Sequence, residues 1–475
     1  MHKWLFPLLL FSSCIREMDN LEEVREFHVS TDIAPIYEDL PLFDHPLSLK
    51  EIIDIALERN LDIFVKEHEI AVQSQTAEMF AMQTLPQANF NFEQWGRNRH
   101  TGAFSESLVP NIPPAPPSIG QTQNVTRYTA GYVFNVLDFA MAIFRSKMEI
   151  NKALVQKIDL IRFTQTMQFE ITKQYWKAIA AKVAHDRAET LIPKLRAFQE
   201  RLDSQIARRL TPEIEGLTNK GIYVNILMQI EGYSKDYHDA IYILKQTMGI
   251  PPETNLVLAL EDMSTSIEID PNDIPDLEQI ALRSRPELYS KDVEEKIAMD
   301  EIRLGLYSMI PGLAPFAQAD YDGNRFLIFN HWLSAGIRST WDLLKIPSHY
   351  YESETGWAKK YLARAHRLNQ SLIVLTQVNL GYFTYYDTKK QYELMSEISK
   401  IKKRLFAIAQ VEVRAGEFPM EYLLRFEGES ILAEISAYKA YGDMKTALEG
   451  LNNAIGIPFY LDTECAANEG AMALL

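Results

Sequence analysis

The chain has 475 residues, and its 48 Lys and Arg against 64 Asp and Glu give a net charge of -16. This acidic balance argues against a nucleic-acid-binding surface, which requires clustered basic residues, and suits a face or lumen that passes cations more readily than anions. Two cysteines, Cys14 and Cys465, are too few for a disulfide framework, and no Cys/His cluster has zinc-site spacing. We therefore predict no metal and no cofactor.

The N-terminus has the pattern of a secretory signal. Lys3 precedes an apolar run from Trp4 to Phe11, and Ser12-Ser13-Cys14 follows. In a bacterial protein this arrangement resembles a lipoprotein signal, so we expect residues 1–13 to be removed and Cys14 to carry the acyl anchor. The alternative is a plain signal peptide with an incidental cysteine.

Two short helices are expected after an extended linker. Residues 14–46 are polar and contain three prolines, which predicts a lipid-anchored extended linker. Ser48 is a suitable N-cap for a first helix that ends near Asn60. A second helix is predicted from about Leu61 to Thr84, because Pro86 removes a donor and disfavours helix before it.

A β-hairpin is predicted over about residues 87–136. The first strand alternates apolar Ala88, Phe90 and Phe92 with polar Asn89, Asn91 and Glu93, and the second places Tyr128, Ala130, Tyr132, Phe134 and Val136 on one face. Each strand is about ten residues long, the length that crosses a hydrocarbon layer when tilted. No other stretch reaches about 18 consecutive apolar residues, so any membrane crossing is assigned to strands. The alternative is an ordinary half-buried hairpin.

A long helical hairpin is predicted over about 139–249. The first helix lacks glycine and has Pro193 as its one proline up to about Leu210, so its roughly 70 residues would extend on the order of 100 Å. Such a helix must pack against similar helices. The returning helix is expected from about Glu213 to Met248, with Gly249 as its terminator.

The whole arrangement then recurs, which indicates a tandem duplication. Ala56-Leu57 and Pro86 recur at one offset as Ala281-Leu282 and Pro311, and Gly249-Ile250-Pro251 recurs as Gly456-Ile457-Pro458. The second copy predicts a hairpin over about 312–341, with Gln318, Asp320 and Asp322 polar and Leu333, Ala335, Ile337 and Trp341 apolar, and a long helical hairpin over about 350–456. The predicted divisions are repeat one at 47–260, an inter-repeat linker at 261–273, repeat two at 274–460 and a tail at 461–475.

These motifs, in this order and twice over, resemble the TolC-type outer-membrane efflux proteins. The resemblance covers about Leu47 to Pro458 and also includes Trp341-Asp342-Leu343 and Arg414-Ala415-Gly416-Glu417. It implies a membrane α/β-barrel fold: a homotrimer in which each chain gives four transmembrane strands to a twelve-stranded barrel, continued by a coiled-coil periplasmic tunnel. The implied partners are a periplasmic adaptor, an inner-membrane pump and outer-membrane lipid, and the implied function is the exit duct of multidrug efflux or export.

Barrel geometry supports three copies independently. Four strands cannot close a barrel, and eight leave an interior only wide enough for side chains. The polar positions are therefore expected to line the pore: Asn89, Asn91, Glu93, Gln318, Asp320 and Asp322.

The resemblance also places the gate and the adaptor-docking surface at the two helical turns. The residues expected there are Arg208, Arg209, Pro212, Glu215, Arg414, Gly416, Glu417, Glu421 and Arg425. The family usually has glycine at both turns, whereas repeat one has Arg209. Tyr422 and Arg425 occupy positions that can carry an acidic ring, so a cation-binding ring is not expected unless Glu417 and Glu421 replace it.

Two other classes of protein share some of these features. An enzyme would need a Gly-rich phosphate loop, a Gly-x-Ser-x-Gly elbow or a His-Glu-x-x-His motif, and the sequence has none of them. A periplasmic coiled-coil lipoprotein, acting as adaptor or scaffold, would share the signal, the helices and the acidic charge. The alternating aromatic strands argue against that second class.

Overall fold

The computed structural model divides the chain into two compact units, which are described separately. The second unit comprises residues 65–162 and 285–373, and the first comprises the remainder. The structure describes residues 21–37, 43, 45–103, 113, 116–208, 213–260, 263, 271–417 and 420–456.

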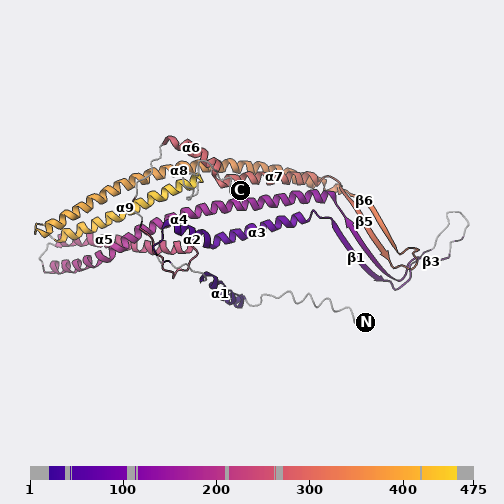
Figure 1. Cartoon of the computed structure of the whole chain (residues 1–475), viewed down its shortest axis with the longest axis horizontal. Coiled ribbons are helices and arrows are strands. Elements are labelled where there is room, and N and C mark those ends of the chain that lie inside the picture. Colours follow the sequence, from indigo (N-terminus) through magenta and orange to yellow (C-terminus); the bar gives the residue numbers. More distant parts are fainter. Residues whose placement is uncertain are drawn as a thin grey trace. The chain divides into compact units, whose positions relative to one another are not determined.

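The second unit carries an antiparallel four-stranded sheet (Figure 1). Its strands are β1 (Gln87–Gly96), β4 (Asn124–Val133), β5 (Gly312–Asp322) and β6 (His331–Thr340), in the order β1-β4-β5-β6. Two short strands, β2 (Gly102–Ala103) and β3 (Ser118–Ile119), pair within the first hairpin's loop. Both predicted hairpins are therefore confirmed, and they join through β4 and β5.

Helices lead into and out of each hairpin in the same order. In chain order, α2 (Leu49–Arg59), α3 (Leu61–Met82), the β1–β4 hairpin, α4 (Val136–Ala207) and α5 (Glu213–Thr247) are followed by α6 (Ile274–Ser284), α7 (Pro286–Tyr307), the β5–β6 hairpin, α8 (Ile346–Arg414) and α9 (Met420–Ile455). The helices α4 and α8 contain 72 and 69 residues. The long-helix prediction is confirmed in both halves of the chain.

The core of the first unit lies along these helices. Four apolar side chains at helical spacing on α4 are buried: Ile171, Tyr175, Ile179 and Val183. Further along, leucines of α4 pack with residues of α5 and α9 in a cluster of Leu191, Leu195, Phe198, Leu202, Tyr223, Ile226, Ile230 and Leu424. The aromatics Phe198 and Tyr223 thus serve interhelical packing.

Caps and terminators fix the helix ends where the sequence predicts them. Ser48 and Glu51 form a capping box at the start of α2. Gly249 and Gly456 follow α5 and α9 with φ of 64° and 86°, a left-handed conformation that favours glycine. A Cβ on Gly249 would lie 2.3 Å from the carbonyl oxygen of Arg59.

Two sequence predictions are wrong. Within the linker that was expected to be extended, residues 21–37 form helix α1 (Leu21–Tyr37). Glu22 and Glu23 lie in its first turn, where carboxylates stabilise a helix N-terminus, and this signal was outweighed by the prolines. The strand expected to reach Val136 ends at Val133, because Val136 already begins α4, and the Asn135 side chain accepts from the amide of Leu137.

Candidate functional site

The strand register gathers the predicted polar residues on one face of the sheet. Residues directly opposite each other in an antiparallel pair project to the same side. Asn89, Gly131, Gln318 and Ser334 form one such row, and Asn91, Thr129, Asp320 and Trp332 form the next. Glu93, Arg127 and Asp322 form a third. All six residues expected to line a pore therefore share one face, which we call the polar face.

The carboxylates of the polar face are held by side chains of the same strand and of the neighbouring strand. Asp320 Oδ1 accepts from Thr129 Oγ1 at 3.0 Å, and its Oδ2 accepts from Gln318 Nε2 at 2.9 Å. Asp322 Oδ2 lies 2.9 Å from Arg127 Nη2. Arg127 Nη1 also lies 3.5 Å from Glu93 Oε2. Each acid of this face thus has a polar partner.

Arg127 and Thr129 are site residues that the sequence reasoning missed. Their signal was present, since they alternate with Tyr128, Ala130 and Tyr132, which were assigned to the apolar face. The period of two assigns residues 127 and 129 to the polar side.

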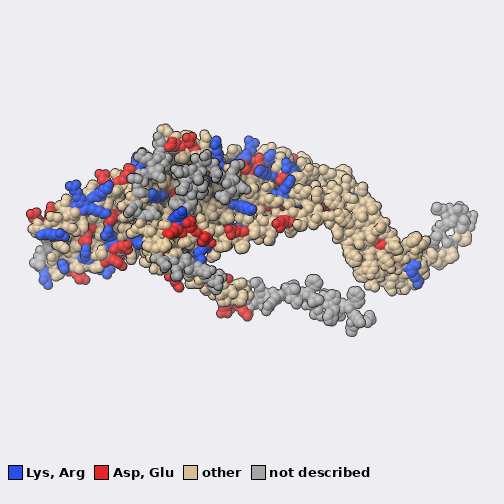
Figure 2. All heavy atoms as spheres, in the orientation of Figure 1, with Lys and Arg blue, Asp and Glu red and all other residues tan. Residues whose placement is uncertain are grey.

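The opposite face is apolar and exposed. It carries Phe90, Tyr128, Tyr321, Leu333 and Ile337, of which Leu333 and Ile337 are 87% and 75% exposed. The Tyr128 ring lies 5.3 Å from that of Phe92 and 5.8 Å from that of Tyr321. Figure 2 shows few charged side chains over the strands and many over the helices. An exposed apolar patch of this extent on a sheet indicates a surface that contacts a membrane or another protein.

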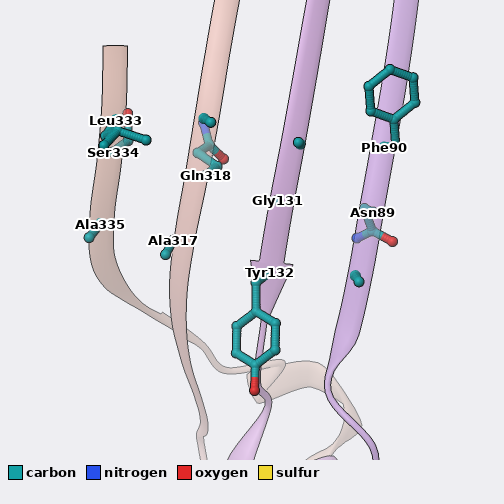
Figure 3. Close-up of a pocket in the computed structure, with 12 residues that line it drawn as sticks. Asn89, Phe90, Gly131, Tyr132, Ala317, Gln318, Leu333, Ser334 and Ala335 are labelled. Atoms are coloured by element: carbon teal, nitrogen blue, oxygen red, sulfur yellow. The ribbon is translucent and has the colours of Figure 1, made fainter.

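The sheet is hollowed near the start of β1 and the end of β4. A cavity of about 680 Å³ is lined by all four strands, including Gly131, Ala317 and Ala335, as Figure 3 shows. Phe90 and Tyr132 project from neighbouring strands at this level (Figure 3). Small residues at the centre therefore leave space that larger side chains on either side do not fill.

The predicted gate residues lie around the two helical turns of the first unit, and the structure describes five of them. Arg208, Arg414, Gly416 and Glu417 are exposed, and Gly416 ends α8 with a φ of 77°. The amide of Glu417 donates to the carbonyl of Glu412 at 3.0 Å, as in a helix terminated by a left-handed glycine. Outside the described residues lie Arg209 and Pro212, the side chains of Glu215 and Glu421, and Cys14.

Arg425 belongs to an ion-pair network that sequence reasoning did not find. Its Nε lies 2.9 Å from Glu429 Oε1 within α9, and Glu429 Oε2 accepts from Lys402 Nζ of α8 at 2.7 Å. Burial acts to raise the pKa of Glu429, but the hydrogen bonds from Lys402 and Arg425 overcome it and lower that pKa. Glu429 therefore links α8 to α9 as a carboxylate.

Two further acids of α9 form ion pairs with the long helices. Glu427 Oε1 lies 2.5 Å from Lys194 Nζ of α4, and Glu434 contacts Lys403 Nζ of α8 at 2.9 Å and Arg187 Nε of α4 at 3.5 Å. Sequence periodicity could not pair these residues, because each pair joins two different helices. The acids of α9 thus join three helices of the first unit.

The described residues contain no group of His, Cys, Asp and Glu suited to hold a metal ion. Among the described helices, none combines the length and the apolar character needed to span a bilayer.

Similarity to known proteins is found at the level of structure. No protein-family model and no curated sequence matches the chain. The CmeC outer membrane channel of Campylobacter jejuni superimposes with a TM-score of 0.67 and 11% identity over 88% of this chain and 87% of that chain. The outer-membrane channel OprN gives 0.66 and 13% over 86% and 89%. The open state of the MtrE outer membrane channel of Neisseria gonorrhoeae gives 0.64 and 14% over 87% and 90%. The chain therefore has the fold of the TolC-type outer-membrane channels.

Proposed function

We propose that this chain is one third of a TolC-type exit duct of an efflux or export system in the bacterial outer membrane. Three copies form a twelve-stranded barrel through which substrates pass from the periplasm to the exterior. The helices extend into the periplasm, where an adaptor protein and an inner-membrane pump engage the helical turns. The chain performs no chemistry of its own in this proposal.

The observation that carries the proposal is the two-faced sheet. Its polar face is lined by hydrogen-bonded carboxylates and amides, and its opposite face exposes aromatic and aliphatic side chains. This division suits a wall between water and lipid. It is the reverse of a soluble sheet, which buries its apolar face.

The edges of the sheet support several copies. Within the described residues, β1 pairs only with β4 and β6 only with β5, so each edge strand has one side without a partner in this chain. Backbone donors and acceptors cannot remain unpaired in a bilayer. Pairing β6 of one copy with β1 of the next satisfies both edges and closes a barrel after three copies.

The ion pairs of α9 support a gate near the helical turns. Opening an entrance there requires α8 and α9 to separate from neighbouring helices, and Glu427 of α9 binds Lys194 of α4. We propose that Glu427 stabilises the closed entrance. The variant Glu427→Gln is expected to increase the open fraction in conductance recordings.

Single-particle images and conductance test the proposal together. The detergent-extracted protein is expected to show a threefold hollow cylinder, with roughly 100 Å of helix and about 25 Å of barrel. In planar bilayers, Asp320→Asn and Asp322→Asn are expected to reduce cation selectivity, whereas Tyr321→Phe, on the opposite face, is expected to leave it unchanged. A compact particle without conductance would reject the duct and favour the periplasmic lipoprotein scaffold.

A further inference from the structure

The turn between β5 and β6 exposes four apolar side chains in succession. Residues Phe326, Leu327, Ile328 and Phe329 form this tip cluster, and their exposed fractions are 43%, 37%, 91% and 74%. Turns and loops between strands usually carry small or polar residues. A run of four large apolar residues at the end of a hairpin therefore indicates that another apolar surface covers it.

Hydrogen bonds hold the base of this turn in place. Asn324 is 7% exposed, its Nδ2 donates to the carbonyl of Gly120 at 3.0 Å, and its Oδ1 accepts from the amide of Thr122 at 3.2 Å. Asn330 Nδ2 donates to the carbonyl of Asp322 at 2.8 Å. The polar groups at the base are thus satisfied within the sheet and the first hairpin's loop. The tip cluster is presented by an ordered turn.

The position of the tip cluster matches the edge of a hydrocarbon layer. Strand β6 has ten residues, and at about 3.3 Å per residue with a tilt near 40° it spans about 25 Å, the height of the apolar band of a membrane barrel. At the other end of β6, Trp341 and Leu344 are 54% and 93% exposed. Exposed apolar groups therefore bracket the strand at the spacing of two membrane interfaces.

A cation lies beside the tip cluster. The Arg325 guanidinium carbon is 4.9 Å from the centroid of the Phe326 ring. An apolar group next to a guanidinium fits the boundary between acyl chains and headgroups, where the ring meets hydrocarbon and the cation meets phosphate. The tip cluster is also continuous along the chain with the apolar face of β6, which carries Leu333 and Ile337.

We propose that the tip cluster is a lipid-binding anchor that inserts into the outer leaflet of the membrane, with Arg325 on a headgroup phosphate. This inference rests on the proposed function, because it requires the sheet to cross the membrane. It adds a specific lipid contact beyond the strands themselves. The anchor fixes the depth of the second hairpin in the bilayer.

Photo-cross-linking in isolated outer membranes tests the anchor. The probe residue is benzoylphenylalanine, introduced into the full chain in place of Ile328 and, in a second variant, Phe329. Because both side chains are largely exposed, a larger aromatic group is tolerated without refolding the turn. We expect irradiation to give lipid adducts detected by mass spectrometry, with a yield matching that of a probe at Leu333 and several-fold above that of a probe at Asn91.

The two control positions separate failure of the anchor from failure of the duct. Lipid adducts at Leu333 but not at Ile328 or Phe329 overturn the anchor alone. Capture of a second copy or of another protein at both tip positions, in place of lipid, also overturns it. Absence of lipid adducts at Leu333 as well overturns the membrane-crossing sheet and hence both proposals.

Discussion

Neighbouring residues on β1 allow the two faces of the sheet to be compared with the same substitution. Phe90 is the fourth of ten residues in the strand, is 69% exposed and lies on the apolar face, whereas Asn91 lies on the polar face opposite Thr129. A lysine near the middle of a lipid-facing strand costs about 2 to 4 kcal/mol. Phe90→Lys also removes a ring contact with Tyr128 at 6.4 Å, worth about 1 kcal/mol. The expected total of about 3 to 5 kcal/mol lowers the equilibrium constant for assembly more than a hundredfold.

Asn91→Lys is the matched control. Its ammonium group would project from the polar face near Glu93 and Asp320, which are carboxylates, so we expect a change of under about 1 kcal/mol in assembly. The assay refolds each purified variant into lipid vesicles and measures the protease-resistant assembled fraction. Equal loss of assembly in both variants, or loss in Asn91→Lys alone, would contradict the assignment of faces.

Two further predictions concern stability, measured by urea unfolding followed by circular dichroism. Gly249→Ala is expected to lower the free energy of unfolding by about 2 kcal/mol or more. The added Cβ would lie 2.3 Å from the carbonyl oxygen of Arg59, and the backbone at this position has a positive φ, which alanine disfavours. Gly416→Ala, with a similar φ and no atom within 4 Å of the added Cβ, is expected to cost only about 1 kcal/mol, and equal losses would refute the steric argument. Burial raises the pKa of Glu449 from 4.5 to about 7. Between pH 4.5 and 7, Glu449 is protonated in the folded chain and ionised in the unfolded chain. The free energy of unfolding should therefore fall by about 3 kcal/mol as pH rises from 4.5 to 7. Glu449→Gln should remove this slope, and a slope that persists in the variant would assign it to other groups.

Local signals were sufficient to predict most of the elements. Ser48, Gly249 and Gly456 end or begin helices through interactions within a few residues, and the sequence contains all of that information. Alternation of polar and apolar residues similarly assigned Asn89 and Asp320 to one face. The periodicity of apolar residues and the signals that start or end a helix are local properties, so a single sequence contains them.

Contacts between distant segments could not be predicted in the same way. The ion pair between Lys402 and Glu429 depends on how α8 and α9 are rotated about their axes. Helix α1 was missed because its helical signal was weak against the prolines of the segment. In both cases, tertiary placement or a balance of small local preferences decided the outcome.

The seam between β4 and β5 shows why the polar face has side-chain pairs of this kind. The strands of each hairpin, β1 with β4 and β5 with β6, are consecutive partners joined by one loop, but β4 and β5 belong to different hairpins and share no such loop. A slip of one residue there would move every side chain of one hairpin to the opposite face. The bonds of Thr129 to Asp320 and of Arg127 to Asp322 cross this seam. A slip would separate both pairs and bring apolar residues opposite the carboxylates. The side-chain pairs of the polar face therefore specify the register of β4 with β5 as well as the polarity of that face.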